Sequence, residues 1–376
     1  MNIYVISMIV TLITAFIIRF VKWSEKQKRN LFPLFVFILW GSIMAFRDTS
    51  VGTDTLNYSN IFQTIVHSNW TDLVQTQEFR KFPLYCIYNK LIGIISDSKQ
   101  WIIFCNSFIY MFGIILFIKK ESKNYIISFI LFLCFHFYFY AMNASRQSIA
   151  MMLIMWAFYF SKNGKKKQSI ILLISAVFIH AIAIIGIIYL ITTSIIWNRR
   201  KVIFACVIVC VLLMFVSILA NLFAYIFPEY YDYVKADGVF SFLNMNNSHG
   251  SRIFISLYIS ILLLYCIYLR KRKIKYRLIS RKSMIYYQTD QQFYQLLVLS
   301  FIAILWTIIL RRNDLFARVE YIFSYTWMIS IPYCIETTIT NKNKRIIYLV
   351  TILFLLIPFY FKLDDYLPYI IGNFYG

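Results

Sequence analysis

The sequence predicts an all-α polytopic membrane protein with about eleven or twelve transmembrane helices. Of its 376 residues, 60% are hydrophobic and only 14% are charged, which is less charge than a soluble chain of this length carries. Apolar runs long enough to span a bilayer recur along the whole chain. Six prolines and ten glycines leave few loop signals between these runs. We therefore expect a single integral membrane domain over residues 1–376.

In the first half of the chain, an external segment at 47–100 separates two groups of helices. Pro83–Ser96, within that segment, is short and carries Lys90 in its middle, so we interpret it as interfacial or re-entrant. No positive charge precedes the first apolar core, which favours a retained anchor with an external N-terminus. The expected spans are residues 1–18, 31–46, 101–118 and 125–141, with a fifth that begins near Gln147.

The apolar run 168–197 lies between two basic clusters, Lys165–Lys167 and Arg199–Lys201. The positive-inside rule places both clusters on the cytoplasmic side. A single long helix would put one of them outside, whereas two shorter helices that turn near His180 satisfy both. We expect this hairpin, with His180 in a protected polar setting, because broken helices at membrane depth line cavities or are buried in protein.

In the second half, the main features are an external segment at 227–252 and a basic cytoplasmic loop at 270–282. The expected spans are residues 202–226, 253–269, 292–310, 318–337 and 346–361.

The net charge of +22 indicates orientation and not a nucleic-acid partner. Most of the 38 lysines and arginines fall in short loops that the positive-inside rule makes cytoplasmic, where they favour contact with anionic lipid. The acids in or near that side are Glu25, Glu121, Asp290 and Glu336.

The seven cysteines lie in apolar surroundings without a CxxC pair, and the four histidines lack metal-ligand spacing. We therefore expect no metal site of the His/Cys type and no cofactor. His67 and His136 are expected to be structural.

The stretch Arg47–Tyr58, RDTSVGTDTLNY, places many charged and hydroxyl groups directly after an apolar run, and Gly52 gives its backbone room to turn. One interpretation is a wall of a polar cavity on the outer side of the membrane, because ionisable groups at the membrane edge favour function. The alternative is an interfacial loop with hydrated charges.

Several arginines also fall at external helix ends, where the positive-inside rule disfavours them: Arg146, Arg252, Arg311, Arg312 and Arg318. A shared reason would be an anionic ligand, since guanidinium binds phosphate bidentately and helix N-termini at Gln147 and Arg318 add N–H donors. Local explanations stay open for each residue: Arg47 paired with Asp48, Arg146 at a capped helix start, Arg311 and Arg312 in a solvated loop, Arg318 paired with Glu320, and His180 as a satisfied core histidine.

Four motifs together resemble the EpsG family, which groups with the Wzy polymerases of O-antigen, capsule and exopolysaccharide synthesis. The stretch at 47–58 resembles the family's first external motif, and NASRQSIA at 143–150 is similar to its second landmark. FIHAIAII at 178–185 resembles the third, and Arg318 with Tyr321 and Phe323 fits the fourth. The resemblance extends over about 31–337.

The resemblance implies a GT-C-like glycosyltransferase in the bacterial cytoplasmic membrane, with its active site facing the outside. Such an enzyme joins oligosaccharide repeats carried on undecaprenyl pyrophosphate, which serve as both donor and acceptor, and the lipid pyrophosphate leaves. The resemblance also implies two further partners, membrane lipid and a chain-length regulator protein. Dolichol-type relatives often carry adjacent acidic pairs for metal. Asp48 and Asp54 are six residues apart here, so we expect metal independence.

Within that reaction, fixed guanidinium groups would stabilise the charge on the leaving group. We expect Arg146 and Arg318 to hold the pyrophosphate, with Arg47 and Arg311 or Arg312 as helpers. His180 is the first candidate base for the acceptor hydroxyl, and Asp54 is the second. The other expected substrate-binding residues are Asp48, Thr53, Tyr58, Asn143, Gln147 and Arg252.

Two other functions stay open at this point. A glycan ligase of related fold would share the external arginines but use a different acceptor. A flippase or transporter of the lipid-linked repeat would need ionisable groups facing a cavity open to both sides, usually with repeat symmetry. The sequence shows neither repeats nor charges in the inner half of its spans, and a purely structural scaffold would leave the external arginines unexplained.

Overall fold

The computed structural model describes residues 2–215, 218, 221–222, 225–226, 250–277, 283–310, 314–361 and 363–372. Every regular element in these ranges is a helix, and the β-contact found there is an isolated bridge between Arg47 and Ile371. The all-α prediction is therefore confirmed.

The chain divides into two compact units, each of which is described here by itself. The N-terminal unit comprises Met1–Ile191 and Leu349–Gly376, and the central unit comprises Thr192–Tyr348. The expectation of a single membrane domain stays a prediction.

Five helices in the described ranges are long and apolar enough to cross a membrane, and a bent helix pair makes a sixth such span. The multi-pass prediction is thus confirmed, while the count of about eleven or twelve stays a prediction. The five helical segments are Ile3–Phe20, Lys99–Glu121, Arg252–Arg270, Asp290–Ile308 and Asn343–Phe361.

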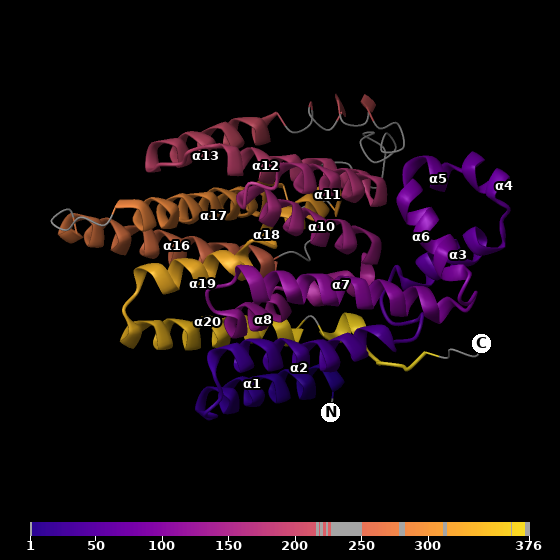
Figure 1. Ribbon diagram of the computed structural model, residues 1–376, viewed down its shortest axis with the longest axis horizontal. Helices are drawn as coiled ribbons and strands as arrows, with labels where there is room; N and C mark the ends of the chain where they lie inside the picture. The colour runs from indigo at the N-terminus through magenta and orange to yellow at the C-terminus, as the bar shows by residue number, and fades with distance from the viewer. Residues whose placement is uncertain are drawn as a thin grey trace. The chain divides into compact units, whose positions relative to one another are not determined.

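In the N-terminal unit, long helices lie side by side, with α2 between α1 and α7 (Figure 1). Side-chain caps define several helix starts: Asn2 caps α1, and Ser24 with Gln27 forms a capping box at α2. The long helices and their continuations are α1 (Ile3–Phe20), α2 (Glu25–Ala45), α7 (Lys99–Glu121), α8 (Tyr125–Cys134), α9 (Phe137–Asn143), α10 (Ser145–Lys162) and α11 (Lys166–Ile179).

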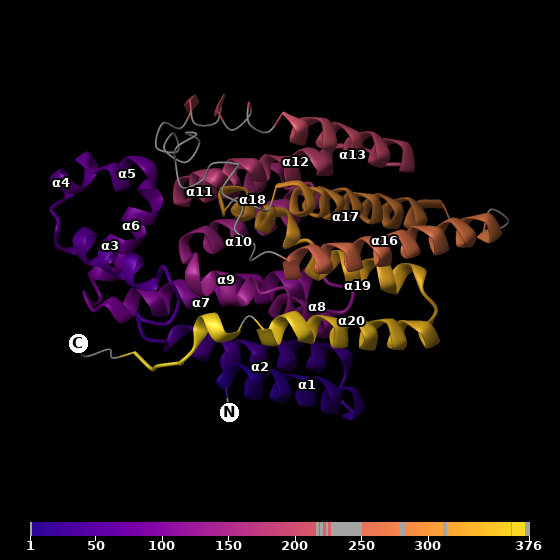
Figure 2. The ribbon, with the colours of Figure 1, turned by 180° about the vertical axis from the view of Figure 1, so that it is seen from behind.

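The external segment folds into four short helices that gather at one end of α7 (Figures 1 and 2). They are α3 (Thr55–His67), α4 (Trp70–Gln75), α5 (Gln77–Lys81) and α6 (Pro83–Gly93). Lys90 on α6 donates from Nζ to the carbonyls of Ile65 and Val66 at 3.1 and 2.7 Å, so this lysine caps the C-terminal turn of α3. Helix α6 has 11 residues, so the Pro83–Ser96 stretch is short as expected, and its interfacial or re-entrant position stays a prediction.

The expected single helix at 125–141 is wrong, because the chain breaks into α8 and α9 with a bend of 50°. His136 lies at the break in the left-handed region, with φ of 63° and ψ of 19°. That conformation interrupts the helical hydrogen-bond ladder. Figure 2 shows α9 between α7 and α10. At the end of α9, Asn143 accepts a hydrogen bond from the backbone N–H of Thr53 in the turn after α2.

The hairpin expected within 168–197 is confirmed. Helix α11 ends at Ile179, His180 is extended with φ of −154° and ψ of 114°, and a 3-10 helix η1 (Ala181–Gly186) leads into α12 (Ile187–Ser194). A Cβ added at Gly186 would lie 2.8 Å from Ile154 and 3.0 Å from Leu173, so the returning segment packs directly on α10 and α11.

The central unit contains α13 (Arg199–Met214), α16 (Gly250–Arg277), α17 (Ser283–Leu310), α18 (Asp314–Ser324) and α19 (Trp327–Thr338). The expected continuous helix at 318–337 is wrong, since α18 ends at Ser324 and α19 begins at Trp327. Most of the external loop 227–252 and residues 278–282 of the basic loop lie outside the described residues, as does much of the expected helix 202–226 beyond Phe215.

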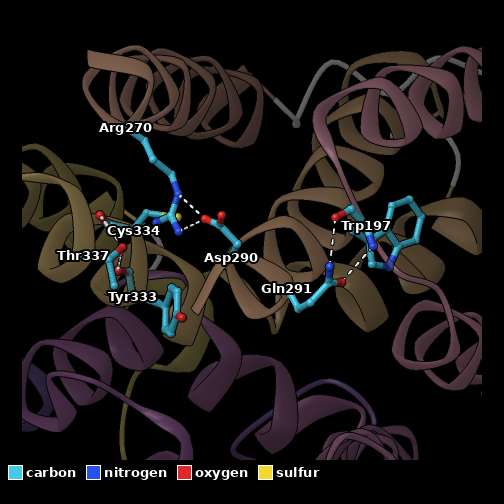
Figure 3. A network of polar contacts seen from close by, with 7 residues as sticks. All are labelled: Trp197, Arg270, Asp290, Gln291, Tyr333, Cys334 and Thr337. Carbon is cyan, nitrogen blue, oxygen red and sulfur yellow. Dashed lines mark hydrogen bonds and ion pairs between the residues drawn. The ribbon is translucent and has the colours of Figure 1, made fainter. Parts of the chain in front are cut away.

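Two polar contacts join elements within the central unit (Figure 3). Gln291 pairs with the backbone of Trp197, accepting from its N–H at 2.8 Å and donating to its carbonyl at 3.1 Å. Arg270 on α16 donates to Asp290 on α17, with 2.9 Å between Nε and Oδ1.

The four acids that the charge pattern places near the cytoplasmic side all form ion pairs. Glu121 pairs with Lys162, joining the ends of α7 and α10, and Asp290 pairs with Arg270. The other two pairs are Glu25 with Lys28 and Glu336 with Lys344.

Candidate functional site

The turn after α2 packs against Asn143 and is hydrogen-bonded to it. Gly52 has φ of 101°, and a Cβ there would lie 2.7 Å from both Asn143 Oδ1 and Thr55 Oγ1. Thr53 N–H donates to Asn143 Oδ1 at 3.0 Å, and Asn143 Nδ2 donates to the hydroxyl of Tyr366 at 3.0 Å. Asn143 therefore links the first and second sequence motifs to the C-terminal segment, and Gly52 is required for the close approach.

Arg47 lies inside the protein, with an exposed fraction of 2%. Its guanidinium donates to the carbonyl of Met44, to Ser107 Oγ at 3.1 Å and to the carbonyl of Met142 at 3.0 Å. Burial lowers the pKa of Arg47 to about 10, so the side chain stays charged at neutral pH. Arg47 thus joins the C-terminal ends of α2 and α9 to Ser107 of α7, and the cavity wall that the sequence suggested stays a prediction.

The alternative pairing of Arg47 with Asp48 is not formed. Asp48 Oδ1 accepts from the backbone N–H of Ser50 at 2.9 Å and from its hydroxyl at 2.7 Å. Partial burial of Asp48 acts to raise its pKa, but hydrogen bonds from Ser50 and Thr49 outweigh burial, and the net pKa is lowered. Asp48 thus shapes the turn.

A C-terminal strap, residues 363–372, covers this turn. Asp48 N–H donates to the carbonyl of Ile370 at 2.8 Å, and Gly372 N–H donates to the carbonyl of Phe46 at 2.9 Å. The hydroxyl of Tyr369 donates to the carbonyl of Ile43 at 2.9 Å. The strap therefore forms part of the scaffold around Arg47.

Arg146, near the start of α10, lies in an aromatic cage with one carboxylate. Its Cζ is 3.6 Å from the ring centroid of Phe82, 5.5 Å from that of Tyr85 and 5.6 Å from that of Tyr58. Nη1 lies 3.3 Å from Glu78 Oε2, and the side chain is 12% exposed. Its Nε is buried and makes no hydrogen bond in the described part of the chain. This arrangement fixes the plane of the guanidinium.

His180 lies on the same aromatic ring as Arg146. Its ring centroid is 5.9 Å from that of Phe82, and the histidine is 5% exposed. Phe82 directly precedes α6, so the break after α11 brings the imidazole next to the N-terminal end of that helix. The structure thus brings Tyr58, Arg146 and His180 together from three separate motifs. We name Tyr58, Glu78, Phe82, Tyr85, Arg146 and His180 the Arg146 cluster.

Sequence reasoning missed Glu78, Phe82 and Tyr85, which come from α5 and the start of α6. The Phe82–Pro83 pair marks a break between two short helices, which was the available signal. Nothing in the sequence indicates that the ring of Phe82 contacts both Arg146 and His180, which lie far along the chain from it.

The remaining candidates of the N-terminal unit differ in their surroundings. Asp54 precedes α3, is half-buried and makes no capping hydrogen bond with its side chain. Thr53 is exposed. Gln147 is 1% exposed, and its Oε1 accepts from the hydroxyl of Tyr140 at 2.7 Å, so this amide supports the junction of α9 and α10.

In the central unit, Arg252 pairs with Glu320 at 3.5 Å, and both side chains are buried. Arg252 Cζ lies 4.5 Å from the ring centroid of Tyr321 and 5.9 Å from that of Trp327. Glu320 therefore has an ion-pair partner on α16, and Arg318 is half-buried on the same helix as Glu320. Arg311 and Arg312 lie outside the described residues. The convergence of Arg146 with Arg318 stays a prediction.

No three His, Cys, Asp or Glu side chains gather as a metal-ion site within the described ranges. The metal independence expected from the sequence stays a prediction.

Comparison with known proteins assigns the chain to a family. The family model described as EpsG family matches residues 29–371, nearly the whole chain. No curated protein and no solved structure matches this chain. EpsG family members are Wzy-type polymerases, so the match supports a polysaccharide polymerase in general. A protein of many apolar helices whose Arg146 cluster joins three family motifs thus belongs to the EpsG family.

Proposed function

We propose that this protein is a glycosyltransferase that joins oligosaccharide repeats carried on undecaprenyl pyrophosphate, at the outer face of the bacterial cytoplasmic membrane. Family membership supports the polymerase class. The single observation that supports this chemistry best is the Arg146 cluster, where a guanidinium and an imidazole share the ring of Phe82.

Arg146 is the proposed ligand of the leaving pyrophosphate. The ring of Phe82 holds the guanidinium in place before substrate binds, and a donor that is already oriented stabilises developing negative charge at little reorganisation cost. The N-cap of α10, Ala144, makes no side-chain hydrogen bond, so the first-turn N–H groups have no capping side chain. These N–H groups add to the attraction for an anion.

His180 is the proposed general base. The acceptor hydroxyl oxygen forms a bond to the anomeric carbon of the donor while the bond from that carbon to the pyrophosphate oxygen breaks. His180 takes the hydroxyl proton. The bonding electron pair leaves with the lipid pyrophosphate, and Arg146 stabilises the negative charge that results. Asp54 is the second candidate for this base, because its carboxylate lies one turn before Tyr58 at the start of α3.

The other proposed ligands surround this centre. Tyr58 stacks on a sugar ring of the substrate. For Arg318 and Arg252 in the central unit, with Arg311 or Arg312 as helpers, binding of the lipid-linked repeat stays a prediction from the sequence. Arg47 and Asn143 act by positioning the turn, because their polar atoms bond to the protein itself.

The test is reconstitution of the purified protein with lipid-linked repeats on the accessible face. We expect a ladder of longer glycans. Arg146→Ala abolishes the ladder, and Arg146→Lys lowers the rate more than tenfold because lysine lacks the planar fork. His180→Gln lowers kcat by about 10²–10⁴ while lipid pyrophosphate binding remains.

The matched control is Arg80→Ala, which removes an exposed arginine from the same external segment and leaves the ladder unchanged. Folding of each variant is checked by its thermal unfolding profile. Movement of the lipid-linked repeat across vesicles without bond formation would overturn the polymerase assignment in favour of a flippase.

A further inference from the structure

We propose that Glu78 occupies the position of the substrate's pyrophosphate in the empty enzyme and must leave Arg146 before substrate binds. Glu78 is thus an internal counter-ion that sets the affinity of the site for the lipid pyrophosphate. This inference rests on the proposed function of Arg146.

The geometry of the cage leaves a defined edge of the guanidinium for an anion. Phe82 covers a face of the Arg146 guanidinium at 3.6 Å, and Nε is buried. Nη1 points toward Glu78 Oε2 at 3.3 Å. Because phosphate oxygens approach a guanidinium along its edge, in the plane of its N–H bonds, an anion that binds Nη1 competes with this carboxylate.

Glu78 is also able to leave. Its side chain is 42% exposed, against 12% for Arg146. Within the described part of the chain, the carboxylate makes its contact with Arg146 and no other hydrogen bond or ion pair. A rotation of the Glu78 side chain therefore breaks one partly exposed ion pair, which is a weak interaction.

The neighbouring groups do not replace Glu78 as the competing anion. Cys86 lies close to the pair, but burial and then the Glu78 carboxylate raise its pKa to about 11, so it is neutral at physiological pH. Burial raises the pKa of Tyr85 to about 12, so its hydroxyl, which accepts a hydrogen bond from Asn106 at 3.2 Å, is neutral as well. Glu78 is then the negative charge in direct contact with Arg146.

Two effects of the Glu78 charge oppose substrate binding. The carboxylate neutralises Arg146 in the empty state, and it repels a pyrophosphate that approaches the same edge. Replacement of the carboxylate by a neutral amide of the same shape is therefore expected to tighten binding by about three- to tenfold, the range of a partly exposed charge contact.

The experiment measures the binding of undecaprenyl pyrophosphate without glycan to the full-length protein in nanodiscs. Glu78→Gln is compared with the wild type, with Arg146→Ala and with the double variant. We expect Glu78→Gln to lower Kd three- to tenfold and to lower KM in the polymer assay with kcat unchanged. In the Arg146→Ala background, the same change has a smaller effect, because the competition for the guanidinium is gone and only the repulsion between Glu78 and the pyrophosphate remains.

Asp97→Asn is the matched control, since Asp97 is an exposed carboxylate of the same external segment that lies 3.7 Å from His67. It leaves Kd unchanged. An equal or weaker affinity of Glu78→Gln would overturn the proposal, as would a loss of kcat with unchanged KM, which is the signature of a catalytic base.

The two proposals fail in different ways. If Arg146→Ala binds the lipid pyrophosphate as the wild type does, the proposed function of Arg146 is wrong. If Arg146→Ala loses binding of the lipid pyrophosphate and Glu78→Gln does not bind it more tightly, only the proposed role of Glu78 is wrong.

Discussion

Two arginines of the N-terminal unit show how the surroundings of a side chain decide its role. Arg47 gives hydrogen bonds to two carbonyls and a hydroxyl of its own protein, and it is almost fully buried. Arg146 is held by aromatic faces and one partly exposed carboxylate, so its edge can exchange partners. The first arrangement suits a fixed structural centre, and the second suits a binding site.

Gly52 allows a test of the turn at the scale of one residue. We expect Gly52→Ala to destabilise the protein by about 1–3 kcal/mol and to reduce activity, because the new Cβ collides with Asn143 Oδ1 in a left-handed backbone conformation. Thermal unfolding of the purified protein measures this loss.

Gly164→Ala is the matched control for backbone strain. Gly164 also has a positive φ, of 77°, but nothing lies within 4 Å of an added Cβ. We expect a smaller loss, of about 1 kcal/mol or less. Equal losses in the two variants would show that the contact with Asn143 contributes nothing.

At the scale of elements, the breaks in helices matter more than their lengths. The bend at His136 carries Asn143 to the turn after α2, and the break at His180 carries an imidazole to α6. Phe82, between the short helices α5 and α6, supplies the ring that both His180 and Arg146 contact.

The C-terminal strap gives a prediction at this scale. Removal of residues 367–376 deletes the hydrogen bonds that Ile370 and Gly372 make to the Arg47 turn. We expect a lower thermal midpoint and loss of polymer formation, because the turn that holds Asn143 loses its cover. Removal of 373–376 alone retains these contacts and serves as the control, so similar defects in both truncations would contradict the role of the strap.

At the scale of the whole molecule, the two units each present an arginine with a glutamate and aromatic rings: Arg146 in the N-terminal unit and Arg252 in the central unit. The proposed reaction requires Arg146 and Arg318 to act on one pyrophosphate. Arg146→Ala and Arg318→Ala should each weaken the binding of undecaprenyl pyrophosphate, and their effects should be coupled by more than about 0.5 kcal/mol.

A double-mutant cycle on the dissociation constant checks this coupling. Additive effects within about 0.3 kcal/mol would contradict a shared ligand. Arg80→Ala combined with Arg146→Ala supplies the reference for two independent sites, since Arg80 is exposed.

The sequence by itself determined the helical class, the multi-pass character, the hairpin at His180 and the motifs of the EpsG family. Hydropathy, charge asymmetry and short motifs are local properties, so they can be read along the chain. The two wrong helices, at 125–141 and 318–337, break inside mainly apolar stretches, at Phe135–His136 in the first case and at Tyr325–Thr326 in the second, and hydropathy cannot show a backbone break inside such a stretch.

Only the tertiary structure decided which of the polar groups meet. It directed Arg47 inward to carbonyls of its own protein, placed the C-terminal strap over the turn, and put Glu78 and Phe82 beside Arg146. These contacts join residues from tens to more than three hundred positions apart. They depend on the packing of helices against one another, which no local pattern in the sequence encodes.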